Sequence, residues 1–219
     1  MIDYLIINKK NIKELITNKI VKYDYINKKL VILSDIKILK INLKEITTLI
    51  CNSINLKYLN ISKLINLKKL YCKNNDLKEL NINNNTKLKY LNCDVNKLKE
   101  LNLNNNTKLE RLGCNNNQLQ ELNLNNNTKL KILVCAKNQL KELNLTNNIN
   151  LKILYCNTNL FKILNLNNNN KITYLETDNN VILLSNNPTE YLINFHKDNV
   201  MNDKQYNNYI NELKNIDII

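Results

Sequence analysis

The chain has 219 residues and a formal net charge of +13 at pH 7, with one glycine, one proline and no tryptophan. No segment approaches the roughly 20 apolar residues that a membrane-spanning helix needs, and the start MIDYLIINKKNIKEL lacks the pattern of a secretory signal. These features favour a cytoplasmic, reducing location. The abundance of Asn, Lys and Ile, which have AT-rich codons, suggests an AT-rich genome. Such a genome is typical of a low-GC bacterium or of a large DNA virus, whose protein would lie in the host cytoplasm.

Residues 1–29 precede the repetitive part of the chain and are predicted to form an N-terminal cap. Within them Asn11–Lys19 is expected to be a short helix, because Ile12, Leu15 and Ile16 fall on one face. Such a segment would cover the open end of the first coil, since an exposed sheet end invites unwanted pairing. Two degenerate half-coils then lead into the repeats: Leu30/Ile32 and Leu39/Ile41.

A 21-residue repeat occupies the middle of the chain. Residues 88–108, LKYLNCDVNKLKELNLNNNTK, are followed directly by residues 109–129, LERLGCNNNQLQELNLNNNTK. Such a fixed period is the signature of a stacked repeat array. We number the positions of each coil from 1 to 21. The coils begin at Ile46, Leu67, Leu88, Leu109, Leu130, Leu151 and Ile172.

Each coil reads LxxLxCxxNxLxxLxLxxNxx, and three of its columns are distinctive. Position 6 holds every cysteine: Cys51, Cys72, Cys93, Cys114, Cys135 and Cys156. Position 9 holds Asn75, Asn96, Asn117, Asn138, Asn159 and Asn180, and position 19 holds Asn85, Asn106, Asn127, Asn148 and Asn169. The cysteines are expected to be buried free thiols rather than disulfides or metal ligands, because they take core positions otherwise filled by Leu or Ile. The asparagines are expected to end the strands, tolerating left-handed backbone, and to bond from coil to coil.

The segments LKYLNCDVNKL, LERLGCNNNQL and LKILVCAKNQL match LxxLxLxxNxL, the core signature of the leucine-rich repeat family, with Cys in a Leu position. Over residues 46–180 the chain resembles this family, in a short type with 21-residue repeats. The resemblance implies a β-rich solenoid, a right-handed superhelix with a parallel sheet and with capping segments at both ends. It also implies protein binding rather than catalysis.

The second half of each coil repeats the alternation of the first half. Leu101 and Leu103, for example, alternate with Glu100 and Asn102, which is a strand period. An outer helix would need more residues than the Asn-rich turns leave. We therefore predict two facing parallel sheets over a solenoid of residues 30–184, instead of a strand-and-helix horseshoe.

The repeat pattern fails before Pro188, and residues 185–219 are predicted to form a C-terminal helical cap. Asn202 or Asp203 offers a helix start signal. Four residues follow at helical spacing: Tyr206, Ile210, Leu213 and Ile216. His196, the only histidine, has no evident nucleophile or metal partner, so a structural or solvent-exposed role is favoured over catalysis.

Comparison of the repeats with one another indicates where a partner would bind. The outward positions of the second half barely vary: Glu79, Glu100, Glu121 and Glu142 beside Asn81, Asn102, Asn123 and Asn144. Those of the first half differ at every coil and include Tyr and Arg, which are over-represented at binding hot spots. The residues expected to bind a protein partner are Lys69, Tyr71, Tyr90, Arg111, Ile132, Val134, Ile153, Tyr155, Tyr174 and Glu176. Drift on an unused surface is the alternative interpretation.

Two other functions stay open at this point. The positive charge is compatible with a basic protein that binds nucleic acid or an anionic surface, since Lys columns at positions 2 and 12 line the edges of the solenoid. A purely structural assembly element is the third possibility. No Gly-rich phosphate loop or catalytic triad is present, so the sequence predicts no enzymatic activity, no cofactor and no metal. The identity of the protein partner and the oligomeric state are left open.

Overall fold

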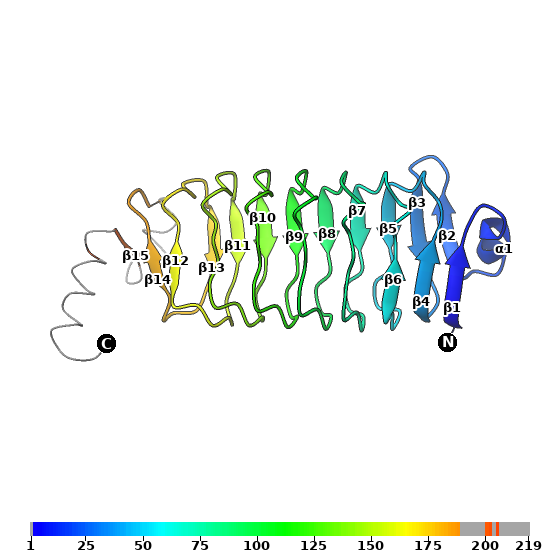
Figure 1. Ribbon diagram of the computed structural model, residues 1–219, viewed down its shortest axis with the longest axis horizontal. Helices are drawn as coiled ribbons and strands as arrows, with labels where there is room; N and C mark the ends of the chain where they lie inside the picture. The colour runs from blue at the N-terminus through cyan, green and yellow to red at the C-terminus, as the bar shows by residue number, and fades with distance from the viewer. Residues whose placement is uncertain (1, 189–199, 203–204, 206–219) are drawn as a thin grey trace.

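The computed structural model describes residues 2–188, 200–202 and 205. They form an elongated solenoid in which short strands stack side by side along the long axis (Figure 1). Among the described residues, α1 (Ile12–Thr17) at the N-terminal end is the only helix whose first and last residues are both defined. No helix among the described residues is long and apolar enough to cross a bilayer.

One side of the solenoid is a nine-stranded sheet, the main sheet, in which every pair of neighbours is parallel except β2 and β3. Its register follows the 21-residue period, so Leu112 lies between Leu91 and Leu133. This confirms the sheet predicted from the first halves of the coils. Its strands, in chain order, are β2 (Val21–Asp24), β3 (Lys29–Ile32), β5 (Thr48–Ile50), β7 (Lys69–Tyr71), β8 (Tyr90–Asn92), β9 (Arg111–Gly113), β10 (Ile132–Val134), β11 (Ile153–Tyr155) and β13 (Tyr174–Glu176).

The opposite side carries a three-stranded parallel sheet at each end and no strand in the second halves of coils 67 to 130. The strands near the N-terminus are β1 (Ile2–Ile7), β4 (Ile36–Ile41) and β6 (Tyr58–Asn60). Those at the other end are β12 (Ile163–Asn165), β14 (Ile182–Leu184) and β15 (Val200–Met201). The predicted second sheet is therefore present at both ends of the solenoid. The prediction that it runs continuously between them was wrong.

The second halves of the central coils do not form a ladder, although their side chains alternate as in a strand. Leu103 is buried and Asn102 exposed, as in a strand. Neighbouring coils are instead joined by the Gln118 N–H, which donates to the Leu98 carbonyl at 2.8 Å. The Asn127 side chain also donates to the Leu103 carbonyl at 3.3 Å. Alternation reports which way a side chain faces, and it does not report whether two backbones pair.

The core is a stack of inward side chains, six apolar ones per coil. In the coil that begins at Leu109, these side chains are at most 7% exposed: Leu109, Leu112, Cys114, Leu119, Leu122 and Leu124. Burying each is worth roughly 1.5–3 kcal/mol. A single coil covers none of its own upper and lower surface, so this gain requires neighbouring coils.

Both ends of the solenoid carry elements outside the regular repeat. The predicted N-terminal helix is confirmed, with Ile12 and Leu15 buried on its inner face. The β1 strand was not predicted, although it pairs with β4, placing Ile7 beside Ile41. The predicted domain boundaries remain predictions.

The described residues also include the beginning of the predicted C-terminal cap. The Asn202 side chain accepts a hydrogen bond from the Gln205 N–H at 2.8 Å, and the Gln205 side chain accepts one from the Asn202 N–H at 2.9 Å. This reciprocal pairing is the geometry of a helix start. The predicted helix body and His196 lie outside the described residues.

The turns that follow strands β5, β7, β8, β9, β10 and β11 depend on two adjacent columns with separate roles. The left-handed backbone occurs at position 8, at Ser53, Asn74, Val95, Asn116, Lys137 and Thr158, with φ between 53° and 57° for most and 52° at Asn116. The position-9 asparagines were expected to adopt this conformation, and that expectation was wrong. Their side chains instead bond from coil to coil: Asn96 donates to the Cys72 and Cys93 carbonyls, both at 3.0 Å.

Candidate interaction face

The outward side chains of β10 and β11, together with Ala136 just after β10, form an apolar patch, defined here as Ile132, Val134, Ala136, Ile153 and Tyr155. The register places Ile132 beside Ile153 and Val134 beside Tyr155. Neighbouring strands lie about 4.8 Å apart, so these side chains are in contact range. Ala136 is buried and the other four are half-buried. The register therefore brings apolar side chains of two adjacent coils together.

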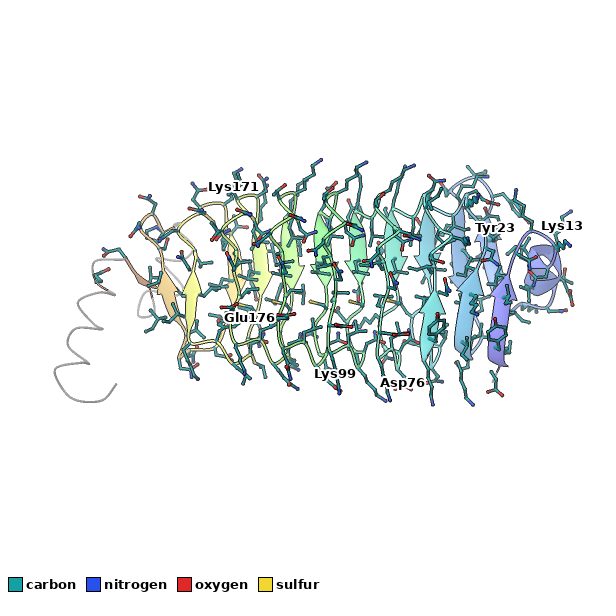
Figure 2. All side chains as sticks on the ribbon, viewed as in Figure 1. Lys13, Tyr23, Asp76, Lys99, Lys171 and Glu176 are labelled. Carbon is teal, nitrogen blue, oxygen red and sulfur yellow. The ribbon has the colours of Figure 1, made fainter. Side chains whose placement is uncertain are left out.

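Tyr155 extends the apolar patch toward the C-terminal end of the main sheet. Its ring lies 4.9 Å from the ring of Tyr174 on β13, at an interplanar angle of 35°. Tyr174 is 38% exposed, and its hydroxyl lies 3.4 Å from a carboxylate oxygen of Glu176. Glu176 projects from the same strand (Figure 2). The far margin of the patch is thus aromatic and acidic.

The N-terminal margin of the patch is basic and aromatic. The Tyr90 ring on β8 lies between two cations, with Lys69 Nζ 5.0 Å and Arg111 Cζ 5.5 Å from its centroid. Each such contact is worth about 0.5–1 kcal/mol at an exposed site. Arg111 therefore turns toward Tyr90, although its strand neighbour on the other side is Ile132. We name these three residues the cationic cluster.

Asp94 lies two residues after β8, in the same coil as Tyr90 of the cationic cluster, and sequence reasoning did not select it. Its Oδ1 accepts a hydrogen bond from the Asn115 N–H at 2.8 Å. A Cβ added to Gly113 would approach the same oxygen at 2.9 Å, so the only glycine of the chain provides room for this carboxylate. Burial raises the pKa of Asp94 above its ordinary value. The only feature of the sequence that could have pointed to Asp94 is the single glycine.

The ten predicted residues are spread over one face rather than gathered in one pocket. From β7 to β13 the main sheet spans five strand spacings, or about 24 Å. Lys69 and Tyr71 line a shallow groove of about 580 Å³ together with Lys29 and Ile50. Two strands, β8 and β9, separate this groove from the apolar patch. Any partner that contacts all ten must therefore be extended.

The opposite side has a different chemical character. A shallow depression of about 870 Å³ there is lined by side chains of both charges: Lys57, Lys78, Glu79, Lys99, Glu100, Gln120, Glu121 and Lys141. Lysine and glutamate alternate along it, so the charges largely compensate. The two sides of the solenoid are thus distinct surfaces, one variable and one repetitive.

Comparison with solved structures identifies the fold. The functional domain of InlJ from Listeria monocytogenes, described as including a cysteine ladder, has 30% sequence identity and a TM-score of 0.50. That match covers 65% of this chain and 40% of the InlJ domain. The internalin InlF from the same species has 21% identity and a TM-score of 0.56, covering 69% of this chain and 50% of InlF. The chain has the leucine-rich repeat fold.

A further leucine-rich repeat structure, the LRIM1/APL1C complex, has 20% identity and a TM-score of 0.51, covering 67% of this chain and 31% of the other. The chain therefore spans half or less of the length of each of these three proteins. No family model and no curated protein matches it. The resemblance inferred from the repeat signature is confirmed at the level of the fold.

The leucine-rich repeats also stack their cysteines into a column, as the sequence predicted. All six are free and buried. The Cys93 Sγ donates to the Gly113 carbonyl of the next coil at 3.3 Å. Burial raises the pKa of Cys51 and Cys156 to about 12, and raises the pKa of the other four far above its ordinary value. The column is therefore part of the core and offers no nucleophile at neutral pH.

We expect all six thiols to react slowly with a thiol reagent in the native protein and completely after denaturation. Reaction requires a thiolate, and burial suppresses both thiolate formation and access. The measurement is the time course of absorbance with a chromogenic disulfide at pH 8, with and without urea. Two or more fast-reacting thiols in the folded protein would contradict the buried column.

Proposed function

We propose that this leucine-rich repeat protein is a non-enzymatic scaffold that binds a protein partner on the outward face of the main sheet. The observation that carries the proposal is the apolar patch with its charged and aromatic margins. An apolar centre with a polar rim is the anatomy of a protein interface. The related fold of the LRIM1/APL1C complex supports a general protein-binding role.

The composition of the two margins supports this choice of face. Tyr and Arg are the residues most enriched at binding hot spots. The face carries Tyr90 and Arg111 on one side of the apolar patch, Tyr155 within it, and Tyr174 on the other side. The strands beneath them pair in continuous register, so these side chains stand on a rigid base. Binding would therefore require little rearrangement of the backbone.

The charges on the two sides of the solenoid support nucleic acid as a partner less well than they support a protein. On the main sheet, acidic Asp94, Glu176 and Asp178 lie among the cations and aromatics. On the opposite side, glutamates adjoin the position-12 lysines. A surface that binds a phosphate backbone requires a stripe of one sign.

A pair of double variants tests the proposed face once the partner has been captured from the native source. We expect Tyr155→Ala with Arg111→Ala to weaken binding by more than about 2 kcal/mol, or roughly 30-fold, because Tyr155 belongs to the patch and Arg111 to its basic margin. Calorimetric titration measures the affinity, and thermal unfolding checks that both variants are folded.

The matched control is Glu121→Ala with Asn123→Ala on the repetitive side. Both side chains are exposed there, and binding is expected to change by less than about 0.5 kcal/mol. If the control double variant weakens binding more than the main-sheet variant does, the interface lies on the opposite side and the proposed face is wrong.

A further inference from the structure

The positive charge of the chain is concentrated on one edge of the solenoid. This edge consists of the turns from the second half of each coil to the first half of the next: residues 62–68, 83–89, 104–110, 125–131, 146–152 and 167–173. We name it the basic edge. It carries one acidic residue, Glu110, and nine exposed lysines: Lys63, Lys68, Lys87, Lys89, Lys108, Lys129, Lys131, Lys152 and Lys171.

The opposite edge, which connects the first half of each coil to the second, is nearly balanced. Over residues 53–58, 74–79, 95–100, 116–121, 137–142 and 158–163 it carries seven lysines and five acidic residues. Figure 2 shows Lys171 at the upper margin of the molecule and Lys99 and Asp76 at the lower margin. Asp76 forms an ion pair with Lys97 at this lower margin. The two edges have similar numbers of lysines, so the asymmetry comes from the acidic residues, one against five, and a codon bias toward lysine does not account for it.

The basic edge is neutralised at one point only among the described ion pairs. Glu110 lies between Lys89 and Lys131 of the adjacent coils, with N–O distances of 3.3 Å and 3.2 Å. These lysines lower the pKa of Glu110, so it is ionised at neutral pH. Successive coils repeat about every 4.8 Å, so the remaining lysines form straight rows along the edge.

Two exposed isoleucines stand in the column next to that of the position-21 lysines. Ile65 is 47% exposed and Ile149 is 49% exposed, and both occupy position 20. Three coils between them have threonine at this position: Thr86, Thr107 and Thr128. Four coil spacings, or about 19 Å, separate the two isoleucines. Exposed apolar side chains next to lysines favour the boundary between lipid headgroups and acyl chains.

The shape and composition of the edge argue against nucleic acid as its ligand. The two sides of the solenoid are about 10 Å apart before side chains are added, so the edge is too broad for a major groove about 12 Å wide. Its six turns contain no aromatic residue on which single-stranded bases could stack. A convex, straight edge can instead lie along a flat surface over its whole length.

We propose that the basic edge binds the surface of a bilayer that contains acidic phospholipids. The lysines contact the headgroups, and Ile65 and Ile149 insert between them near the two ends of the row. In this orientation the main sheet stands beside the membrane rather than against it, so the apolar patch stays accessible. The inference uses none of the residues of the proposed protein interface and is independent of it.

The first test measures partitioning onto vesicles of 30% phosphatidylserine in phosphatidylcholine by flotation at 100 mM salt. We expect binding to these vesicles and none to phosphatidylcholine alone. The variant Lys68→Gln, Lys108→Gln, Lys129→Gln and Lys152→Gln should lower partitioning at least about 100-fold, since each lysine near such a surface contributes about fivefold. These four side chains have no ion-pair partner among the described contacts.

The matched control has the same net charge but changes the other edge: Lys57→Gln, Lys78→Gln, Lys99→Gln and Lys141→Gln. It should lower partitioning less than about tenfold, because these lysines face away from the bilayer. Equal losses in the two quadruple variants would show that only the total charge matters and would overturn the proposal. Absence of binding to the anionic vesicles, or tighter binding to a 25-base-pair duplex than to the vesicles, would also overturn it.

The isoleucines and Glu110 provide variants that change one contribution at a time. Ile65→Thr with Ile149→Thr introduces the residue of the neighbouring coils and should lower partitioning about tenfold at every salt concentration. Leu160→Gln, at the opposite edge and 55% exposed, is its control and should have no effect. Glu110→Gln should raise partitioning about fivefold. If the isoleucine variant binds like the parent protein, the edge does not insert and the assignment to a lipid surface is wrong.

Discussion

Deletion of residues 109–129, one whole coil, is expected to leave a folded protein with a lower melting temperature. The deletion removes β9 and brings β8 beside β10, so Leu91 would pair with Leu133 as it now pairs with Leu112. The asparagine columns stay in phase for the same reason. The stability of a linear array is approximately a sum over its repeats and their interfaces, so one coil can be lost without loss of the fold.

Deletion of only residues 109–118 is expected to abolish cooperative folding. It would place a second half of a coil where the main sheet requires a first half, and would shift every later coil by half a turn. The left-handed turn and the position-9 amide would then be absent from that level. Circular dichroism and urea denaturation measure both deletions. Equal behaviour of the two would mean that the 21-residue unit is wrong.

Asn117→Ala is expected to lower the free energy of unfolding by about 3 kcal/mol. Asn117 is 8% exposed, and its Oδ1 accepts from the Leu98 N–H at 3.0 Å. Its Nδ2 donates to the Cys93 and Cys114 carbonyls, both at 3.1 Å. The substitution leaves the buried Leu98 N–H without a partner, and such a group costs roughly 1–3 kcal/mol. It also removes one of the two amide donors of each carbonyl, which Asn96 and Asn138 still bond at 3.0 Å. Urea denaturation with a fixed m-value measures the change.

Asn126→Ala is the control for the asparagine column. Asn126 is exposed, and its side chain makes one bond, to the Asn104 carbonyl at 3.2 Å. The expected change in unfolding free energy is below about 0.5 kcal/mol. A similar small effect at Asn117 would mean that the position-9 amides do not hold adjacent coils together.

The main sheet and the core could be predicted because they repeat. A position that must face inward at every coil, such as Leu91 or Cys93, is visible as a column in the sequence. The conformation of position 8 could not be predicted this way. Residues as different as Val95 and Lys137 share the same left-handed backbone, so the residue type at this position does not signal the turn. The β1 strand could not be predicted either, since its sequence IDYLII is too apolar to show the alternation of a strand.

The candidate interaction face was predictable as a surface but not as a set of contacts. Its outward positions vary from coil to coil, and variation in a sequence of repeats marks positions that the architecture leaves free. The stacking of Lys69 and Arg111 on Tyr90 depends on side-chain conformations that a sequence does not encode locally. The accommodation of Asp94 by Gly113 likewise joins residues of two coils that no repeat column connects.

The unequal backbone bonding of the two sides has a mechanical consequence. Adjacent coils are joined on the main sheet by a continuous strand ladder, but over the centre of the opposite side largely by asparagine amides and the Gln118 N–H contact with Leu98. Stretching a ladder breaks several hydrogen bonds together, whereas a side-chain amide can lengthen its contact by rotating. The central coils should therefore flex by fanning open on the opposite side, with the main sheet acting as the inextensible layer. The spacing between the strands that contact a partner on the main sheet would therefore stay nearly constant while the solenoid bends.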